Sequence, residues 1–170
     1  MPDDLIDIVR EAAALLAQCR TASLATADER GHPHAANIQY VHDERLHLYF
    51  VSSEDAAHSR HIAVNPAVAL TVYHHNDQDP ANIRGLQLHG RATPIIGKAD
   101  RDMALTLYTS RFPFVSDNPV LGAAVEKQTF YCMTPTWLRL IDNRRGFGWK
   151  AKKELDLNFR KMDFPDDNLG

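Results

Sequence analysis

The stretch TASLATADERGHPHAANIQYVHDERLHLYFV, residues 21–51, decides the fold of this chain. Small, β-prone segments alternate in it with short polar turns, and the first turn ends on Gly31, a residue that turns favour. In the last segment the apolar Leu46, Leu48 and Phe50 alternate with polar neighbours, as in a strand with one buried face. Connections this short pair strands antiparallel. Strands are expected over 21–27, 34–41 and 45–51, separated by turns at 28–31 and 42–44.

Helical and extended patterns on either side of this stretch complete an α+β chain. Apolar residues recur at three- and four-residue spacing over 4–19, which predicts an amphipathic helix. Ser52 or Ser53 is expected to cap a short helix that ends before the Asn65–Pro66 pair. A curved antiparallel sheet of this size removes its free edges by closing into a barrel. The further expectations are strands over 68–73, 83–95, 129–133 and 137–142, and helices over 98–111 and from Pro119.

Length and composition are typical of one soluble globular domain. The chain has 170 residues, of which 44% are hydrophobic and 24% charged. Its net charge of -3 provides no general attraction to nucleic acid or to an acidic membrane. The acidic start of the chain lacks a basic export signal, and no apolar run approaches the ~20 residues of a membrane span. We therefore expect one cytoplasmic domain over 1–170, with a barrel over about 20–150 and a polar C-terminal tail, and neither nucleic-acid nor membrane partners.

Motifs of several common enzyme and metal-site classes are absent. The sequence holds no GxGxxG, GxxxxGK[ST], HExxH or GxSxG motif. Of the nine histidines, His58 and His61 share one helix face, but no nearby cysteine or carboxylate completes a ligand set, so no metal site is expected. Cys19 and Cys132 are expected to be reduced, half-buried thiols. The cations over 144–153 fit a solvated face, because no aromatic stacking module accompanies them.

Short motifs follow one another in a defined order through most of the chain. In chain order they are ASLAT at 22–26, GHPH at 31–34, LYFVSS at 48–53, NPAVALTV at 65–72 and GLQLHGRA at 85–92. Together they resemble the FMN-binding split barrels of the pyridoxamine 5'-phosphate oxidase-like superfamily. The second half resembles the YhbP-like branch of that superfamily, through IRGLQ at 83–87, RFP at 111–113, and DN at 142–143 followed by GFG at 146–148.

The resemblance implies a six-stranded split β-barrel with flanking helices, and a homodimer with two FMN sites at the subunit interface. The flavin phosphate is expected near Ser52 and Ser53, since free backbone N–H groups and the helix dipole at a helix start favour an anion. His58, Ser59 and Arg60 would add donors along that helix. The residues expected to contact FMN are Asn37, Ile38, Gln39, Phe50, Val51, Ser52, Ser53, His58, Ser59, Arg60, Gln87 and, from the neighbouring subunit, Trp149.

Departures from the family pattern leave two functions open. The triplet Ala56–Ala57–His58 stands where many relatives carry Ser/Thr-Arg-Lys toward the phosphate, so haem is the alternative ligand. One hypothesis is a flavin-dependent oxidoreductase that moves electrons between a reduced nicotinamide and a small organic substrate, with the redox chemistry supplied by the cofactor. The other is a non-catalytic module that binds flavin or haem. Neither the substrate nor any catalytic residue follows from the sequence.

Overall fold

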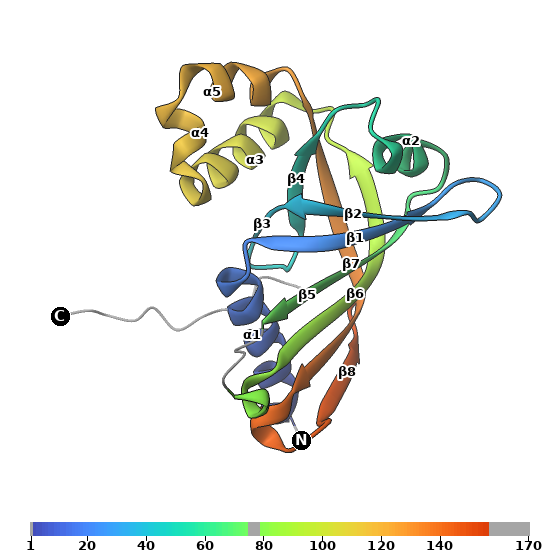
Figure 1. Cartoon of the computed structure of the whole chain (residues 1–170), viewed down its shortest axis with the longest axis vertical. Helices are drawn as coiled ribbons and strands as arrows, with labels where there is room; N and C mark the ends of the chain where they lie inside the picture. Colours follow the sequence, from blue (N-terminus) through green and yellow to red (C-terminus); the bar gives the residue numbers. More distant parts are fainter. Residues whose placement is uncertain (1, 75–78, 157–170) are drawn as a thin grey trace.

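A single curled antiparallel sheet forms the centre of the molecule (Figure 1). The computed structural model describes residues 2–74 and 79–156. The strand order is β2-β1-β5-β6-β7-β4-β3, and β8 pairs with β7 beside this path. The strands are β1 (Thr21–Ala27), β2 (Pro33–Gln39), β3 (Val41–His42), β4 (Leu48–Ser52), β5 (Ala67–His74), β6 (Arg84–Pro94), β7 (Thr129–Asp142) and β8 (Lys150–Glu154). The helices are α1 (Pro2–Gln18), α2 (Ala57–Val64), α3 (Lys98–Arg111), α4 (Pro113–Asp117) and α5 (Pro119–Glu126).

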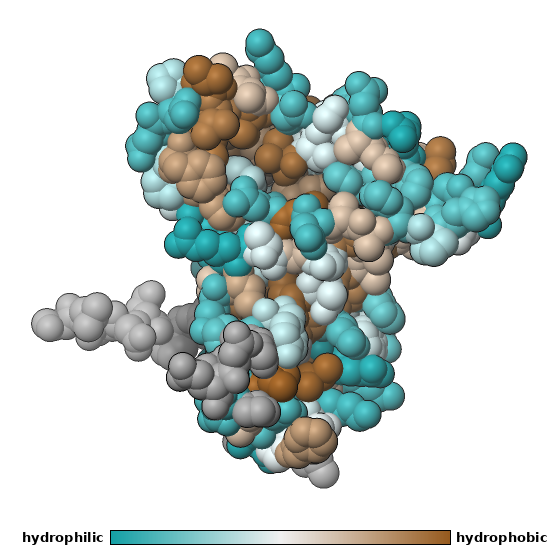
Figure 2. Space-filling view, in the orientation of Figure 1, coloured by the Kyte–Doolittle hydropathy of each residue, from teal (hydrophilic) through white to brown (hydrophobic). Residues whose placement is uncertain are grey.

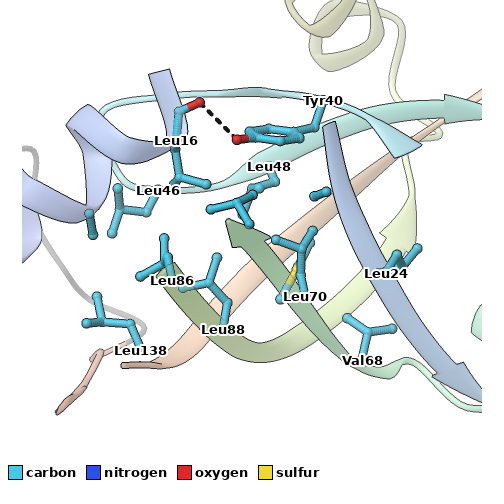
Figure 3. Packing of buried hydrophobic residues seen from close by; sticks show 14 of the residues in the cluster. Leu16, Leu24, Tyr40, Leu46, Leu48, Val68, Leu70, Leu86, Leu88 and Leu138 are labelled. Atoms are coloured by element: carbon cyan, nitrogen blue, oxygen red, sulfur yellow. Dashed lines mark hydrogen bonds between the residues drawn. The ribbon is translucent and has the colours of Figure 1, made fainter. Parts of the chain in front are cut away.

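The main core fills the inside of the curl, where side chains from alternate strand positions meet α1 (Figure 3). In strand β1, for example, exposed and buried residues alternate, so that every second side chain points into the core, and Leu24 is fully buried. Leu16 of α1 packs among these side chains, and Tyr40 donates its hydroxyl hydrogen bond to the Leu16 carbonyl at 2.9 Å. The leucines labelled in this cluster are Leu16, Leu24, Leu46, Leu48, Leu70, Leu86, Leu88 and Leu138.

A second, smaller core joins α3 and α4 to β3, β4 and β7. Its buried members include Tyr49, Tyr108 and Phe112, and the Tyr108 and Phe112 rings lie 4.9 Å apart. Helix α5 contributes no buried residue, although its sequence is largely apolar. Exposed apolar side chains therefore gather over α4 and α5 in Figure 2, where Phe114 and Val120 lie on the surface. Among the described residues, no helix is both long and apolar enough to cross a membrane.

Two turns of the sheet are built in the same way from nearly the same residues. Asp28-Glu29-Arg30-Gly31-His32 joins β1 to β2, and Asp43-Glu44-Arg45-Leu46-His47 joins β3 to β4. In each, the aspartate carboxylate accepts hydrogen bonds from the second and fourth following N–H groups and from the histidine Nδ1. The fourth residue has positive φ in both, 82° at Gly31 and 61° at Leu46. The second turn therefore holds a buried leucine in the left-handed region that glycine normally occupies.

The predicted α+β barrel is confirmed, with a different number of strands. The sheet has eight strands instead of six. Residues 150–154 form β8 although their sequence is polar, because β7 offers them an edge to pair with.

The predicted serine cap is wrong. Helix α2 begins at Ala57 with Ala56 as N-cap, and Ser52 ends β4, where it pairs with Thr129. The first helix, expected over 4–19, spans Pro2–Gln18. Both cysteines are free and half-buried, as expected.

The twin turns give a matched pair of stability predictions. Asp43→Ala is expected to lower the free energy of unfolding by about 1–3 kcal/mol, because the Tyr49 hydroxyl and the His47 ring lose their acceptor. Asp28→Ala removes the corresponding bonds at an exposed turn, so its loss is expected to be smaller. Urea unfolding at pH 7 measures both variants. Equal losses of unfolding free energy in the two variants would contradict the conclusion that the bonds of Asp43 contribute more because they are more buried.

The contribution of Asp43 also depends on pH. Burial by itself would raise the pKa of Asp43, but hydrogen bonds from His47 and Tyr49 and the His47 charge hold it below its usual value. A carboxyl with a lowered folded-state pKa stabilises the fold above its unfolded pKa, and this contribution disappears as the pH falls through the folded-state pKa. The difference in the free energy of unfolding between wild type and Asp43→Ala is therefore expected to become smaller in acid.

Candidate functional site

The loop between β4 and α2 places two of the predicted phosphate residues together. Ser52 ends β4, and its Oγ lies 2.7 Å from Nε2 of His58 in the first turn of α2. Ser53 Oγ accepts a hydrogen bond from the Asp55 N–H at 3.2 Å, and the Ser53 carbonyl accepts one from the Ala56 N–H. Ser53 thus shapes a turn ahead of the helix. The Ser52–His58 pair is the polar centre of this rim of the barrel.

Two more histidines surround His58. The His34 ring from β2 lies stacked over the His58 ring with centroids 6.5 Å apart, and it meets the His61 ring edge-on at 5.7 Å. His61 Nδ1 is hydrogen-bonded to Thr26 Oγ1 on β1 at 3.1 Å. Burial, together with the His34 and His61 charges, lowers the pKa of His58. His58 is therefore mostly uncharged at neutral pH, and in the described part of the chain no His, Cys, Asp or Glu group is arranged to hold a metal ion.

Ser59 and Arg60, the next two residues of α2, lie in different environments. Ser59 is buried, and its Oγ has no hydrogen-bond partner among the described residues. Arg60 is exposed and donates from Nη1 to the carbonyl of Asp55 in the preceding loop. Arg60 is therefore the permanent cation at this rim, while Ser59 faces the interior of the molecule.

The predicted β2 residues lie beside the strand that carries Ser52. Strand β2 leads directly into β3, which pairs with β4, and β2 itself contacts β4. Ile38 is buried in the main core, whereas Asn37 and Gln39 are exposed. The Asn37 side chain accepts a hydrogen bond from Ser23 Oγ at 3.0 Å. Phe50 and Val51 precede Ser52 on β4, and the Phe50 ring lies 6.4 Å from the His58 ring. One chain thus assembles the β2, β4 and α2 residues at one rim.

Gln87 and Trp149 lie away from this rim. Ser52 pairs with Thr129 on β7, whereas Gln87 pairs with Arg139, ten residues farther along the same strand. At ~3.3 Å per strand residue, this corresponds to roughly 30 Å along β7. Trp149 packs against the main core near β8, with the Arg145 guanidinium 4.7 Å above its ring. The sequence could not separate these groups, because the register of β7 follows only from its tertiary pairing.

Gln87 belongs to a polar row that crosses the outer face of the sheet. Strand pairing puts Asn37, Ser23, Thr71, Gln87 and Arg139 next to one another in that order. All of them have exposed or half-buried side chains, and no helix of the described chain has its buried face on them. Arg139 Nη1 donates to Gln87 Oε1 at 3.4 Å. The row starts at Asn37, one of the β2 residues beside the Ser52–His58 rim, and crosses the sheet to Arg139.

Aromatic rings accompany this row on the neighbouring strand positions. Trp137 stacks on His89 with centroids 4.4 Å apart, and the Arg139 guanidinium lies 5.2 Å from the Trp137 centroid. Sequence reasoning missed His34, Thr26 and Arg139 as neighbours of the predicted residues. The available signal was the alternation of β2, which puts His34 on the same face as buried Ile38.

Comparison with known proteins agrees with this architecture. The family model described as pyridoxamine 5'-phosphate oxidase matches residues 8–142. No curated protein matches the sequence. Among solved structures, a haem-binding protein from Mycobacterium smegmatis superposes with a TM-score of 0.72 and 17% identity, over 86% of this chain and 57% of the other. The present chain therefore spans little more than half the length of that protein.

Two further structures have lengths closer to that of this chain. HutZ, the haem storage protein from Vibrio cholerae, has a TM-score of 0.62 and 19% identity, over 74% of this chain and 88% of HutZ. A Clostridium acetobutylicum protein related to general stress protein 26, of the pyridoxinephosphate oxidase family, has a TM-score of 0.65 and 18% identity, over 88% and 96%. At these identities the superpositions establish the fold, and the matched family model covers most of the chain. The chain is a member of the pyridoxamine 5'-phosphate oxidase-like superfamily.

Proposed function

We propose that this protein is a cytoplasmic, homodimeric FMN-binding protein that acts as a flavin-dependent oxidoreductase on a small organic substrate. The observation that carries the proposal is the Ser52–His58 pair at the rim where β2, β4 and α2 meet, in a chain of this superfamily. A reduced nicotinamide is the expected electron donor. FMN, when bound, would supply the redox chemistry, and the protein would hold and orient it.

The residues of the rim offer hydroxyl donors and a positive charge to a phosphate group. Ser52 Oγ and the Ser53 side chain offer hydroxyl groups, and Arg60 provides a permanent positive charge. His58 adds a second charge only when it is protonated. The alanines at 56 and 57 contribute no side-chain donor. These residues would bind and position the phosphate, and the exposed amide of Gln39 lies on the neighbouring strand for a polar edge of the ring.

The separation of Gln87 and Trp149 from the rim supports a homodimer. Because Gln87 and Trp149 lie far from the Ser52–His58 rim of the same chain, one FMN molecule can contact both sets only if a second copy supplies one of them. We expect a stable dimer, and light scattering at micromolar protein concentration measures it. A monomer that still binds FMN with full affinity would contradict a shared site.

Haem binding without catalysis is the second candidate function. Two of the similar structures are a haem-binding protein and a haem storage protein, and this similarity of fold supports testing the ligand directly. The decisive experiment adds FMN and ferric haem separately to purified apoprotein and records absorption spectra and stoichiometry. One FMN per chain, with flavin fluorescence quenched, supports the first proposal. No FMN binding together with a saturable Soret band would replace it with the second.

A further inference from the structure

His42, at the end of β3, has one imidazole nitrogen in a hydrogen bond and one without a partner among the described residues. Its Nδ1 lies 3.0 Å from the main-chain carbonyl oxygen of Asp43. A carbonyl oxygen only accepts hydrogen bonds, so the ring proton is on Nδ1 and the neutral ring carries its lone pair on Nε2. Among the described residues, Nε2 has no hydrogen-bond partner. Burial and the nearby Arg111 charge lower the pKa of His42.

This histidine lines a cavity between α1, α3 and the second twin turn. The cavity has a volume of about 570 Å³, within the range of small-molecule and cofactor sites. Its apolar wall comes from Ala13 of α1 and from Met103 and Leu107 of α3. The turn residues 43–45 complete it. Strand β3 lies between these helices in Figure 1, and its residue His42 is among those that line the cavity.

Some polar groups of the cavity have all their hydrogen-bond partners within the protein, and others can bind a ligand. The Asp43 carboxylate has its partners within the protein, because it accepts hydrogen bonds from two backbone N–H groups, from His47 and from the Tyr49 hydroxyl. The Asp43 carbonyl accepts from both His42 and the Leu46 N–H. The Arg45 side chain is exposed and makes no hydrogen bond or ion pair with the described residues. A fixed imidazole and an available cation thus lie in one cavity, which has an apolar wall and is also lined by Glu44.

The first twin turn shows that the imidazole is not required for folding of the turn. It forms the same set of hydrogen bonds, yet Ala27 stands immediately before its aspartate, in the place of His42. The turn geometry therefore does not need a histidine at this position. A neutral histidine that donates Nδ1–H to a carbonyl is the usual arrangement of a metal-ligating imidazole, because that bond fixes the tautomer and the ring orientation.

We propose that this cavity binds an iron porphyrin, with His42 Nε2 as a ligand to the iron and Arg45 paired with a propionate carboxylate. An iron porphyrin is the ligand class that combines a flat apolar body, a metal that takes an imidazole nitrogen, and carboxylates at one edge. The proposal rests on the haem-binding candidate above and assigns it a location separate from the Ser52–His58 rim. The two sites use different residues, so FMN binding at the rim does not compete with it.

The test is a titration of apoprotein with ferric haem, followed by the Soret band and by electron paramagnetic resonance of the iron. His42→Gln is expected to weaken binding at least about tenfold and to remove the signature of a nitrogen ligand. His32→Gln, a histidine change in the other twin turn, where His32 corresponds to His47, is expected to bind like wild type. Adding imidazole to His42→Gly should restore the wild-type spectrum.

A second variant tests the cavity without changing the ligand. Ala13→Trp fills the apolar wall and is expected to reduce haem binding while the circular dichroism spectrum stays native. Both His42→Gln and Ala13→Trp should keep their affinity for FMN, and His58→Gln should keep its affinity for haem. Absence of haem binding by the wild type overturns the proposal, as does an unchanged spectrum and affinity in folded His42→Gln. Either result leaves the FMN proposal standing on its own titration.

Discussion

Replacing Arg111 with methionine is expected to lower the free energy of unfolding by about 2–4 kcal/mol, the largest loss of stability expected for a single polar side chain here. Arg111 lies at the end of α3, and its Nη2 donates to the carbonyl oxygens of Leu16, Ala17 and Cys19 at 3.2, 2.8 and 2.6 Å. Leu16 and Ala17 belong to the last turn of α1, whose carbonyls lack partners within the helix, and Cys19 directly follows α1. The guanidinium therefore joins α1 to α3 and opposes the negative end of the helix dipole.

Tyr40 makes a double-mutant cycle informative. Its hydroxyl donates to two of the same carbonyls, those of Leu16 and Cys19, both at 2.9 Å. In either single variant, Arg111→Met or Tyr40→Phe, the other residue still holds the shared carbonyls. The double variant leaves them without a donor, so its loss should exceed the sum of the single losses by roughly 1 kcal/mol. Urea unfolding of the four proteins measures this coupling.

Arg101 provides the matched control for this prediction. It lies on the same helix and donates to a single carbonyl, that of Glu126, in a more exposed position. Arg101→Met should therefore cost much less than Arg111→Met. Equal costs, or simple additivity of Arg111→Met and Tyr40→Phe, would show that the end of α1 does not depend on this guanidinium.

The affinity for FMN is expected to increase in acid, and His58 is the reason. Burial and the two neighbouring histidines lower the pKa of His58, so the ring is mostly neutral at pH 7.5. Binding of a phosphate favours the protonated ring, and uptake of a proton therefore accompanies binding. A charge-assisted contact of about 1.5–3 kcal/mol corresponds to about one to two decades of affinity between mildly alkaline and mildly acidic solution. Fluorescence quenching titrations at several pH values measure the effect.

Three variants and the ligand riboflavin separate the contributions of the side chains and of the phosphate to the pH-dependent affinity for FMN. His58→Gln should abolish the pH dependence, whereas Arg60→Gln should weaken binding by a similar factor at every pH. His34→Gln removes a charge that lowers the pKa of His58, so the increase in FMN affinity on acidification should begin at a higher pH. Riboflavin, which lacks the phosphate, should bind with little dependence on pH. Equal pH profiles for riboflavin and FMN would mean that the phosphate lies elsewhere.

The sequence predicted the barrel because its strands have one buried face and short turns between them. A glycine inside a strand, such as Gly90, also indicates a bulge or a close backbone approach. A Cβ there would lie 2.3 Å from the Thr134 carbonyl oxygen, at the point where the register between β6 and β7 shifts. Residues 129–133 and 137–142, on either side of Pro135, are expected from the sequence as two strands. They form one strand, since the irregular register beside Gly90 accommodates the proline.

Other features depend on contacts that no local pattern contains. The helix start moved from Ser52 to Ala57 because pairing of Ser52 with Thr129, a residue far along the chain, extends β4. Local capping preference could not weigh that pairing. The meeting of His34 with His58 depends on α2 packing against β2, and the free Nε2 of His42 depends on the turn that follows it. The elements that carry the candidate residues were thus predictable, but the neighbours of those residues were not.

The twin turns have a consequence for the accuracy of folding. A slip of one residue in a strand pair would move every core side chain to the outer face. In each hairpin the aspartate binds N–H groups at fixed distances along the chain, so only one register satisfies its carboxylate. Both turns close within five residues and can form before distant strands arrive. The correct alternation of Leu24 in β1 and Leu48 in β4 is therefore set locally, before the barrel closes around them.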